Sequence, residues 1–266
     1  MSEPTSGVHD VRVTVCETTH DPAKVGRCWD ALREHTARHR PDIVLLPEFA
    51  LLPPVWERPT SDPGVWRSLV DQADGWIARL PELGCEWVSG AFPRNDDAGH
   101  PRDEAFLWSR DAGYRTLRRK SYLPRERGFW EARWFEPAEP EFPAFSAGPL
   151  TFAVNICTEL WALESVCGYP RLGVQAIMTP RATELATTDL WVALARTVAV
   201  RAGAFSISSN RRHDDGSCGG AGWIIDPEGV ELARTSLAEP FVTRAIDLGR
   251  SSAAQSTYPR YIFAGD

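Results

Sequence analysis

A long uninterrupted apolar run is absent from this sequence of 266 residues. Its longest apolar stretch, Phe49 to Trp56, is interrupted by Pro53 and Pro54, and it is far shorter than the roughly 20 residues that span a membrane as a helix. Residues 1–10 have neither a basic start nor an apolar stretch, so we interpret them as a polar N-terminal extension and not as a signal peptide. The sequence therefore predicts no membrane partner.

An excess of basic charge is also absent. The chain has 29 Lys and Arg residues against 36 Asp and Glu residues, which gives a net charge of −7. A nucleic-acid-binding face needs basic residues that displace counterions, and an anionic membrane attracts the same residues. We therefore expect no nucleic-acid partner.

Cysteines are few and widely spaced. The six cysteines form no CxxC pair and no dense framework of the kind that small secreted proteins use for disulfides. This usage favours a reducing compartment, and we expect the protein to be cytoplasmic.

Apolar residues make up 43% of the chain, enough for one sizeable core. Strand and helix patterns alternate along it, which is typical of an α/β protein. We expect strands at 11–17, 43–47, 85–92, 103–110, 114–120, 150–156, 175–179, 204–210 and 241–247, and helices at 22–39, from 63 to about 80, from about 159, and at 188–202. A hairpin is expected around 226–229, and no linker or repeat divides the chain. We predict a single α/β domain over residues 1–266.

Regular patterning stops between residues 122 and 149, where prolines are frequent and Trp130 and Trp134 occur. A long irregular segment inside a compact domain is usually functional or disordered. Its aromatic residues favour a packed functional loop.

Reactive side chains end three of the expected strands. Glu48 closes DIVLLPE, where partial burial makes a carboxylate a usable base. Cys157 ends LTFAVNIC at an expected strand-to-helix turn, where the helix N-terminus favours a thiolate. Lys120 ends RTLRRK and is suited to stabilising an oxyanion. Each residue alone has a structural alternative: a solvated or ion-paired glutamate, a small buried thiol, and a solvated lysine.

The strings LLPEF, KSYLP and NICTELW occur in this order and resemble the nitrilase, or carbon–nitrogen hydrolase, superfamily. The segments MTPRAT (178–183), ARTVAVRAGAFSISSNR (195–211) and GWIIDPEGVELA (222–233) extend the resemblance over nearly the whole chain. It implies a four-layer αββα sandwich in which two central mixed sheets are flanked by helices. It also implies a homodimer or larger homo-oligomer that pairs through outer helices.

The same resemblance assigns the site residues. Glu48 is the general base, Lys120 the oxyanion stabiliser and Cys157 the nucleophile, and no metal or organic cofactor is needed. Glu136, sixteen positions after Lys120, falls where the family has a second glutamate, and Glu131 is a nearby competitor. The implied mechanism passes through a thioester.

Substrate-binding residues are less clearly marked. The backbone N–H of Thr158 is a second candidate donor to the oxyanion. Arg181 either binds a substrate carboxylate or pairs with a nearby glutamate, Glu159 or Glu184. The tryptophans Trp134 and Trp161 either line an apolar acyl pocket or pack in the core.

The resemblance predicts hydrolysis of a non-peptide carbon–nitrogen bond in a small molecule, most simply a linear amide. An N-carbamoyl amino-acid type of substrate is the next alternative, favoured if Arg181 binds a carboxylate, and nitrile hydrolysis is a further one. Transfer of the acyl group to an amine and a non-catalytic scaffold are the remaining alternatives.

Overall fold

The computed structural model describes residues 10–264. The predicted extension, residues 1–10, lies outside the described residues except for Asp10, which begins the first strand. Within the described chain, no helix is both long and apolar enough to cross a bilayer. All six cysteines are free thiols.

Twelve strands form two halves of one continuous hydrogen-bonded sheet. The first half has the order β12 (Phe241–Asp247), β1 (Asp10–Thr18), β2 (Ile43–Glu48), β3 (Trp87–Asn95), β4 (Pro101–Ser109) and β5 (Gly113–Arg119). The second half has the order β6 (Phe145–Ala147), β7 (Leu150–Val154), β8 (Ala176–Pro180), β9 (Phe205–Arg211), β10 (Trp223–Ile225) and β11 (Glu231–Arg234). The halves join where the ends of β1 and β9 pair in parallel, through Glu17 with Asn210 and Thr18 with Arg211.

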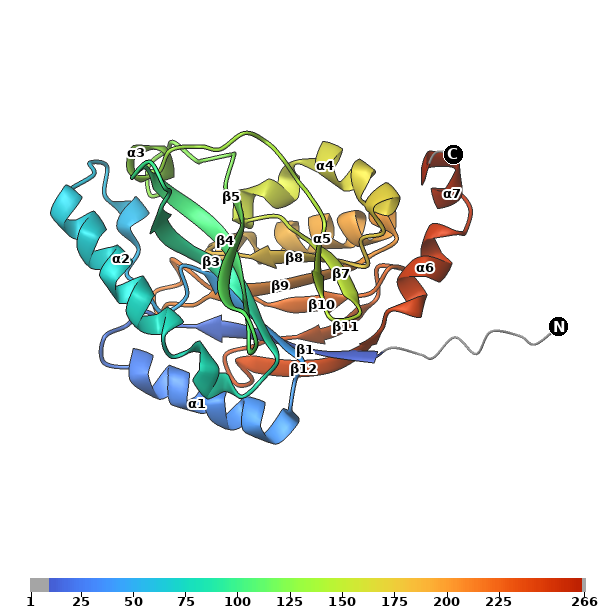
Figure 1. Cartoon of the computed structure of the whole chain (residues 1–266), viewed down its shortest axis with the longest axis horizontal. Helices are drawn as coiled ribbons and strands as arrows, with labels where there is room; N and C mark the ends of the chain where they lie inside the picture. The colour runs from blue at the N-terminus through green and yellow to red at the C-terminus, as the bar shows by residue number, and fades with distance from the viewer. Residues whose placement is uncertain (1–9, 265–266) are drawn as a thin grey trace.

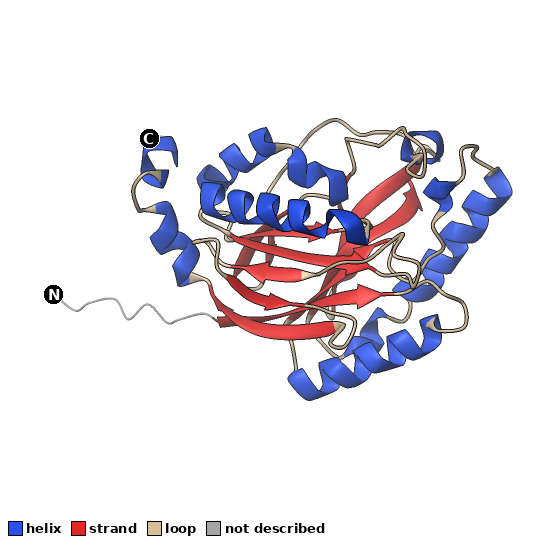
Figure 2. Ribbon diagram, turned by 180° about the vertical axis from the view of Figure 1, so that it is seen from behind, coloured by secondary structure: helices blue, strands red, loops and turns tan. Residues whose placement is uncertain are grey.

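Three apolar clusters separate four layers (Figures 1 and 2). The first cluster packs α1 (Val25–His39) and α2 (Pro63–Ile77) on the outer face of the first half-sheet. The second lies between the inner faces of the two half-sheets. The third packs α4 (Leu163–Gly168) and α5 (Thr188–Ala202) on the outer face of the second half-sheet. The predicted αββα sandwich is therefore confirmed.

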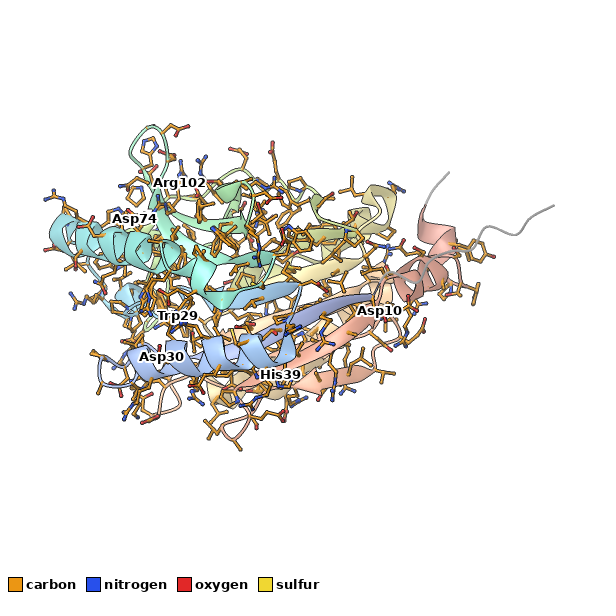
Figure 3. All side chains as sticks on the ribbon, turned by 60° about the horizontal axis from the view of Figure 1, so that its bottom comes forward. Asp10, Trp29, Asp30, His39, Asp74 and Arg102 are labelled. Atoms are coloured by element: carbon orange, nitrogen blue, oxygen red, sulfur yellow. The ribbon has the colours of Figure 1, made fainter. Side chains whose placement is uncertain are left out.

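The outer helices follow their sequence patterns. Asp62 caps α2 by accepting hydrogen bonds from the backbone N–H groups of Gly64 and Val65, and Pro63 occupies the first turn. Trp29 of α1 is fully buried and packs on Trp76 of α2, with ring centroids 5.4 Å apart. Figure 3 labels Trp29 beside Asp30, which is exposed on the same helix. The amphipathic pattern thus buries one face of each helix.

The remaining helical segments are short. They are η1 (Val55–Glu57), η2 (Leu80–Leu83), α3 (Glu131–Trp134), η3 (Cys157–Trp161), η4 (Tyr169–Leu172), η5 (Leu185–Thr187), α6 (Gly249–Gln255) and α7 (Arg260–Ala264). The segment 122–149, predicted to be irregular, contains α3 and β6. The chain after Cys157 begins as a 3₁₀ turn, earlier than the helix predicted from about residue 159. The polar C-terminal segment forms α6 and α7, which the sequence pattern did not predict.

Candidate active site

The three predicted reactive residues meet at one edge of the sandwich. Glu48 is the last residue of β2, Lys120 follows β5, and Cys157 lies three residues after β7. Because β1 and β9 run parallel, the carboxyl ends of β2, β5 and β7 point to the same edge. In α/β sheets this edge is where ligands bind.

Lys120 lies at the centre of a buried charge cluster. Its Nζ donates hydrogen bonds to Glu48 Oε1 at 2.7 Å and to Glu131 Oε2 at 2.6 Å. All three side chains are at most 5% exposed. Burial alone would lower the pKa of the lysine, but Glu131 and Glu48 raise it well above its usual value. Lys120 is therefore an ammonium ion at neutral pH.

Cys157 has a strained backbone and a protonated thiol. Its φ is +48°, in the left-handed region that a side chain with a Cβ rarely adopts. The residue is 5% exposed, and burial followed by the Glu48 charge raises the pKa of the thiol well above its usual value. Lys120 and a hydrogen bond from the backbone of Ala182 oppose that shift. A base must therefore remove the thiol proton before the sulfur can act as a nucleophile.

Glu159 ties the turn at Cys157 to the strand that carries the lysine. Its Oε2 accepts a hydrogen bond from the backbone N–H of Ile156 at 2.8 Å. Its Oε1 accepts from the backbone N–H of Ser121 at 2.7 Å and from Arg118 Nη2 at 3.0 Å. Because Glu159 is fully buried, these bonds hold the two segments in a fixed relation.

The turn after Glu48 is also strained. Phe49 and Leu51 have φ values of +49° and +66°, and with Cys157 they make three of the four non-glycine residues that have positive φ in the described chain. Arg211 supports this turn from β9, because its guanidinium donates to the carbonyl oxygens of Phe49 at 3.1 Å and Leu52 at 2.6 Å. Backbone strain of this kind is concentrated at functional sites.

Glu131, and not Glu136, is the second glutamate that contacts Lys120. Helix α3 points Glu131 and Trp134 inward, three residues apart on one face. The chain is extended after Trp134, which leaves Glu136 exposed. The backbone N–H of Glu136 instead donates to Pro101 O at 2.9 Å. The contact with Lys120 favours Glu131 over Glu136 as the second glutamate.

Arg181 is enclosed between the second half-sheet and α5. Its guanidinium donates to Ser208 Oγ at 2.8 Å, to Thr183 Oγ1 at 2.6 Å and to the carbonyl oxygen of Ala221, and it lies 4.0 Å from the centre of the Trp223 ring. Burial lowers the pKa of the guanidinium to about 9. The hydrogen-bond partners of Arg181 among the described residues include no carboxylate, so the predicted pairing with Glu159 or Glu184 is not observed.

The other expected substrate-binding residues lie in three different environments. Trp134 is buried in the cluster beneath α1 and α2, where its Nε1 donates to Arg58 O at 2.9 Å. Trp161 is 43% exposed and packs edge-on against Trp191 of α5. Thr158 is half-buried beside Cys157. Thr158 directly follows Cys157 in the chain, whereas the two tryptophans pack in different apolar environments.

One group of described carboxyl groups is close enough to share a cation. The oxygens of Glu48, Asp103 and Glu131 lie within 4.8 Å of one another, and the Lys120 ammonium lies among them. The sequence pattern did not single out Asp103, because a polar residue near the start of an exposed-looking strand carries no distinctive signal. The Lys120 side chain itself therefore supplies a positive charge among these carboxyl groups.

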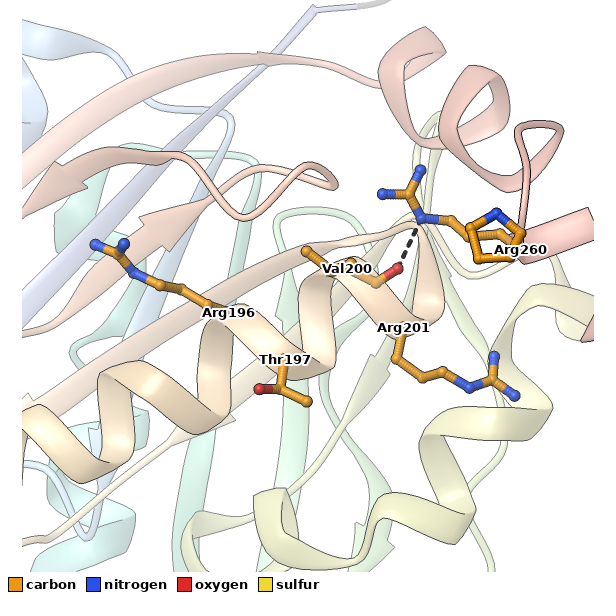
Figure 4. A pocket seen from close by; sticks show the side chains of 6 residues that line it. Arg196, Thr197, Val200, Arg201 and Arg260 are labelled. Atoms are coloured by element: carbon orange, nitrogen blue, oxygen red, sulfur yellow. Dashed lines mark hydrogen bonds between the residues drawn. The ribbon is translucent and has the colours of Figure 1, made fainter.

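A surface pocket lies elsewhere in the described chain. It has a volume of about 500 Å³ and is formed by α5 and the C-terminal segment, including Arg196, Val200 and Arg260 (Figure 4). Arg260 Nε donates to Val200 O at 2.7 Å across it. Because α5 returns the chain from the end of β8 to the start of β9, its last turns lie at the opposite end of the sheet from Cys157. This pocket is therefore separate from the candidate active site.

Comparison with known proteins identifies the family to which the chain belongs. The family model described as carbon–nitrogen hydrolase matches residues 12–255. The chain belongs to the carbon–nitrogen hydrolase family. No curated protein sequence matches it significantly.

Solved structures share the fold at low sequence identity. A carbon–nitrogen hydrolase from Helicobacter pylori G27 has a TM-score of 0.83 and 17% identity, with 96% of this chain and 95% of that chain covered. The C. elegans NitFhit protein has a TM-score of 0.81 and 18% identity, with 96% of this chain and 65% of that chain covered. A mutant of the amidase from Nesterenkonia sp. AN1, with the acetamide moiety of fluoroacetamide added covalently at its active-site cysteine, has a TM-score of 0.73 and 17% identity, with 97% of each chain covered. These similarities establish the nitrilase fold of this chain.

Proposed function

We propose that this protein is a cysteine-dependent amidase that hydrolyses a linear amide through a thioester on Cys157. The observation that carries the proposal is the buried ammonium of Lys120, held by Glu48 and Glu131 beside a strained cysteine. A fixed cation next to a nucleophile is suited to stabilising the negative charge that develops in acyl transfer.

In the proposed reaction, Glu48 takes the proton of the Cys157 thiol and the sulfur attacks the amide carbonyl carbon. Lys120, with the backbone N–H of Thr158 as second donor, stabilises the oxyanion of the tetrahedral intermediate. Glu48 then passes its proton to the leaving nitrogen as the carbon–nitrogen bond breaks. In the second half, Glu48 takes a proton from water, the hydroxyl oxygen attacks the thioester, and the sulfur leaves and regains the proton.

The contacts of Arg181 favour an amide over an N-carbamoyl amino acid. That alternative depended on a guanidinium available for a substrate carboxylate. Arg181 is 1% exposed and donates to two hydroxyl oxygens and a carbonyl oxygen. An amidase is also among the structures that share the fold.

The test is ammonia release from matched linear amides, N-carbamoyl amino acids and nitriles, with wild type beside Cys157→Ala and Glu136→Gln. We expect release from amides by wild type and Glu136→Gln and none by Cys157→Ala. Hydroxylamine added as an acceptor separates hydrolysis from acyl transfer, because a transferase forms a hydroxamate in preference to the acid. Release from nitriles or N-carbamoyl compounds alone would replace the amide proposal, and no turnover of any class would favour a scaffold.

We further propose that the protein forms a homodimer through its α4 and α5 layer. Large apolar side chains are exposed there: Trp161, Leu163, Leu185 and Leu190 are each at least 40% exposed. Large apolar side chains exposed on one layer are a feature of interaction surfaces. Sedimentation analysis of wild type and Leu190→Lys tests this, and a monomeric wild type would contradict it. The free thiols are in keeping with a reducing cytoplasm, which stays a proposal.

A further inference from the structure

The cluster around Lys120 contains one more carboxyl group than the proposed reaction uses. Asp103 is fully buried, and its Oδ2 lies 3.8 Å from Lys120 Nζ, beyond hydrogen-bond distance. Glu48 and Glu131 approach the same ammonium to 2.7 and 2.6 Å. Three carboxyl groups therefore surround one cation in a site that excludes water, and full ionisation would leave two uncompensated negative charges there.

Both oxygens of Asp103 lack a hydrogen-bond donor. Neither Oδ1 nor Oδ2 has a partner among the described residues, although both are buried. An oxygen of Asp103 lies within 4.8 Å of an oxygen of Glu48 and of an oxygen of Glu131. Two ionised carboxylates cannot hydrogen-bond to each other, because both only accept. A proton on one of them turns the repulsive contact into an O–H···O hydrogen bond and removes one of the excess charges.

The fold holds Asp103 in this position. It lies on the inner face of β4 with Ala105 and Leu107, whereas Glu104 lies on the other face and bonds Thr116. The backbone N–H of Lys120 donates to Asp103 O at 2.9 Å, so the lysine and the aspartate are fixed side by side.

We propose that Asp103 is a neutral carboxylic acid that donates its proton in a hydrogen bond to Glu48, and that it acts as a positioning residue for the base. The inference rests on the proposed function of Glu48. Asp103 is the carboxyl group farthest from the ammonium, so it gains least from ionisation. Glu48 then receives one hydrogen bond from Lys120 and one from Asp103, which fixes its carboxylate plane relative to the Cys157 sulfur. Burial, followed by the charge of Glu48, raises the pKa of Asp103 well above its usual value, and Lys120 opposes this while Glu131 reinforces it.

Three variants test the inference through the pH profile of kcat/KM. Asp103→Asn replaces an O–H donor by an N–H donor with no change of charge, so kcat/KM stays within about threefold and the acid limb does not move. Asp103→Leu removes the donor, lowers kcat/KM by about 10- to 100-fold and moves the acid limb to higher pH. Glu104→Gln, the neighbour on the opposite face, is the matched control and leaves the profile unchanged. If Asp103 is instead ionised, Asp103→Asn removes a negative charge and moves the acid limb down by about one pH unit or more, which would overturn the inference.

Infrared difference spectroscopy provides a readout that needs no turnover. The carbonyl band of a protonated carboxylic acid in wild type, sensitive to exchange in heavy water, is expected to vanish in Asp103→Asn and to persist in Glu131→Gln. Loss of the band in Glu131→Gln but not in Asp103→Asn would place the proton on Glu131 and refute the inference. Because the band is measured without substrate, this result is independent of whether the protein is an amidase.

Discussion

Removing the cation from the centre of the site is expected to destabilise the fold strongly and in a pH-dependent way. Lys120 is one of only two lysines in the chain, and Lys120→Met keeps most of the side-chain length while it deletes the charge. Glu48, Asp103 and Glu131 would then lie together in the interior without a counterion.

The size of the effect follows from burial. Lys120 and its two hydrogen-bonded glutamates are at most 5% exposed, so solvent does not screen the loss. Removing one partner of a buried ion pair costs about 3–5 kcal/mol. Burial raises the pKa of Asp103 and of Glu131, and Lys120 opposes both shifts. Removal of Lys120 therefore raises both pKa values further, so the folded variant holds more protons than the folded wild type and releases them on unfolding. Stability of the variant relative to wild type therefore falls as the pH rises, by up to about 1.4 kcal/mol per pH unit for each such proton.

The assay is urea unfolding of wild type, Lys120→Met and Lys24→Met at pH 5.5 and at pH 8.5. Lys24 is the matched control, because it pairs with Asp21 and Asp214 on the surface, where its side chain is 43% exposed, and its loss is expected to change stability little. A deficit in Lys120→Met below about 1 kcal/mol, or one that does not grow with pH, would refute the description of the site as a buried charge cluster.

Three further predictions follow from the same structure. Glu131→Gln lowers kcat for an amide by about 10- to 100-fold because a charged hydrogen bond to the ammonium is lost, whereas the exposed Glu136→Gln stays near wild type; equal losses in steady-state assays would contradict the preference for Glu131. Burial lowers the pKa of His20 from 6.5 to about 4, so the unfolded chain binds the extra proton and stability falls as the pH drops through this range; His20→Gln should lessen that fall by up to about 1 kcal/mol in denaturation experiments, since the ring is half-buried. Gly220→Ala places a Cβ 1.8 Å from the hydroxyl oxygen of the threonine that begins α5. It should therefore cost about 2 kcal/mol more in thermal unfolding than Gly216→Ala, which has the same φ of +76° and whose added Cβ meets the Leu185 side chain at an ordinary contact distance of 3.9 Å.

Helices and strands whose apolar residues recur at a regular spacing were predictable from the sequence. The helix expected at 188–202 and the strand expected at 241–247 have the observed bounds of α5 and β12. In α5 the apolar face is continuous and Gly203 ends the helix in the left-handed conformation. The proximity of Glu48, Lys120 and Cys157 came from family resemblance, because no local pattern relates residues 72 positions apart such as Glu48 and Lys120.

The remaining site features, at Glu131, Arg181 and Asp103, depend on short elements and tertiary contacts that leave no recognisable sequence pattern. Helix α3 has four residues, too short for a periodic signal, so counting positions favoured Glu136 over Glu131. Arg181 was expected to need a carboxylate, but hydroxyl oxygens, a carbonyl oxygen and an aromatic ring satisfy its guanidinium. The proximity of Asp103 to the site results from the pairing of β4 with β5, which is a tertiary contact.

The most direct measurement for the central claim is intact mass after brief exposure to a linear amide, with wild type beside Cys157→Ala. The proposed mechanism predicts an added acyl mass in wild type, located on Cys157 by peptide mapping, removed by hydroxylamine and absent from the variant. An adduct on another cysteine, or amide turnover that persists in Cys157→Ala, would contradict it.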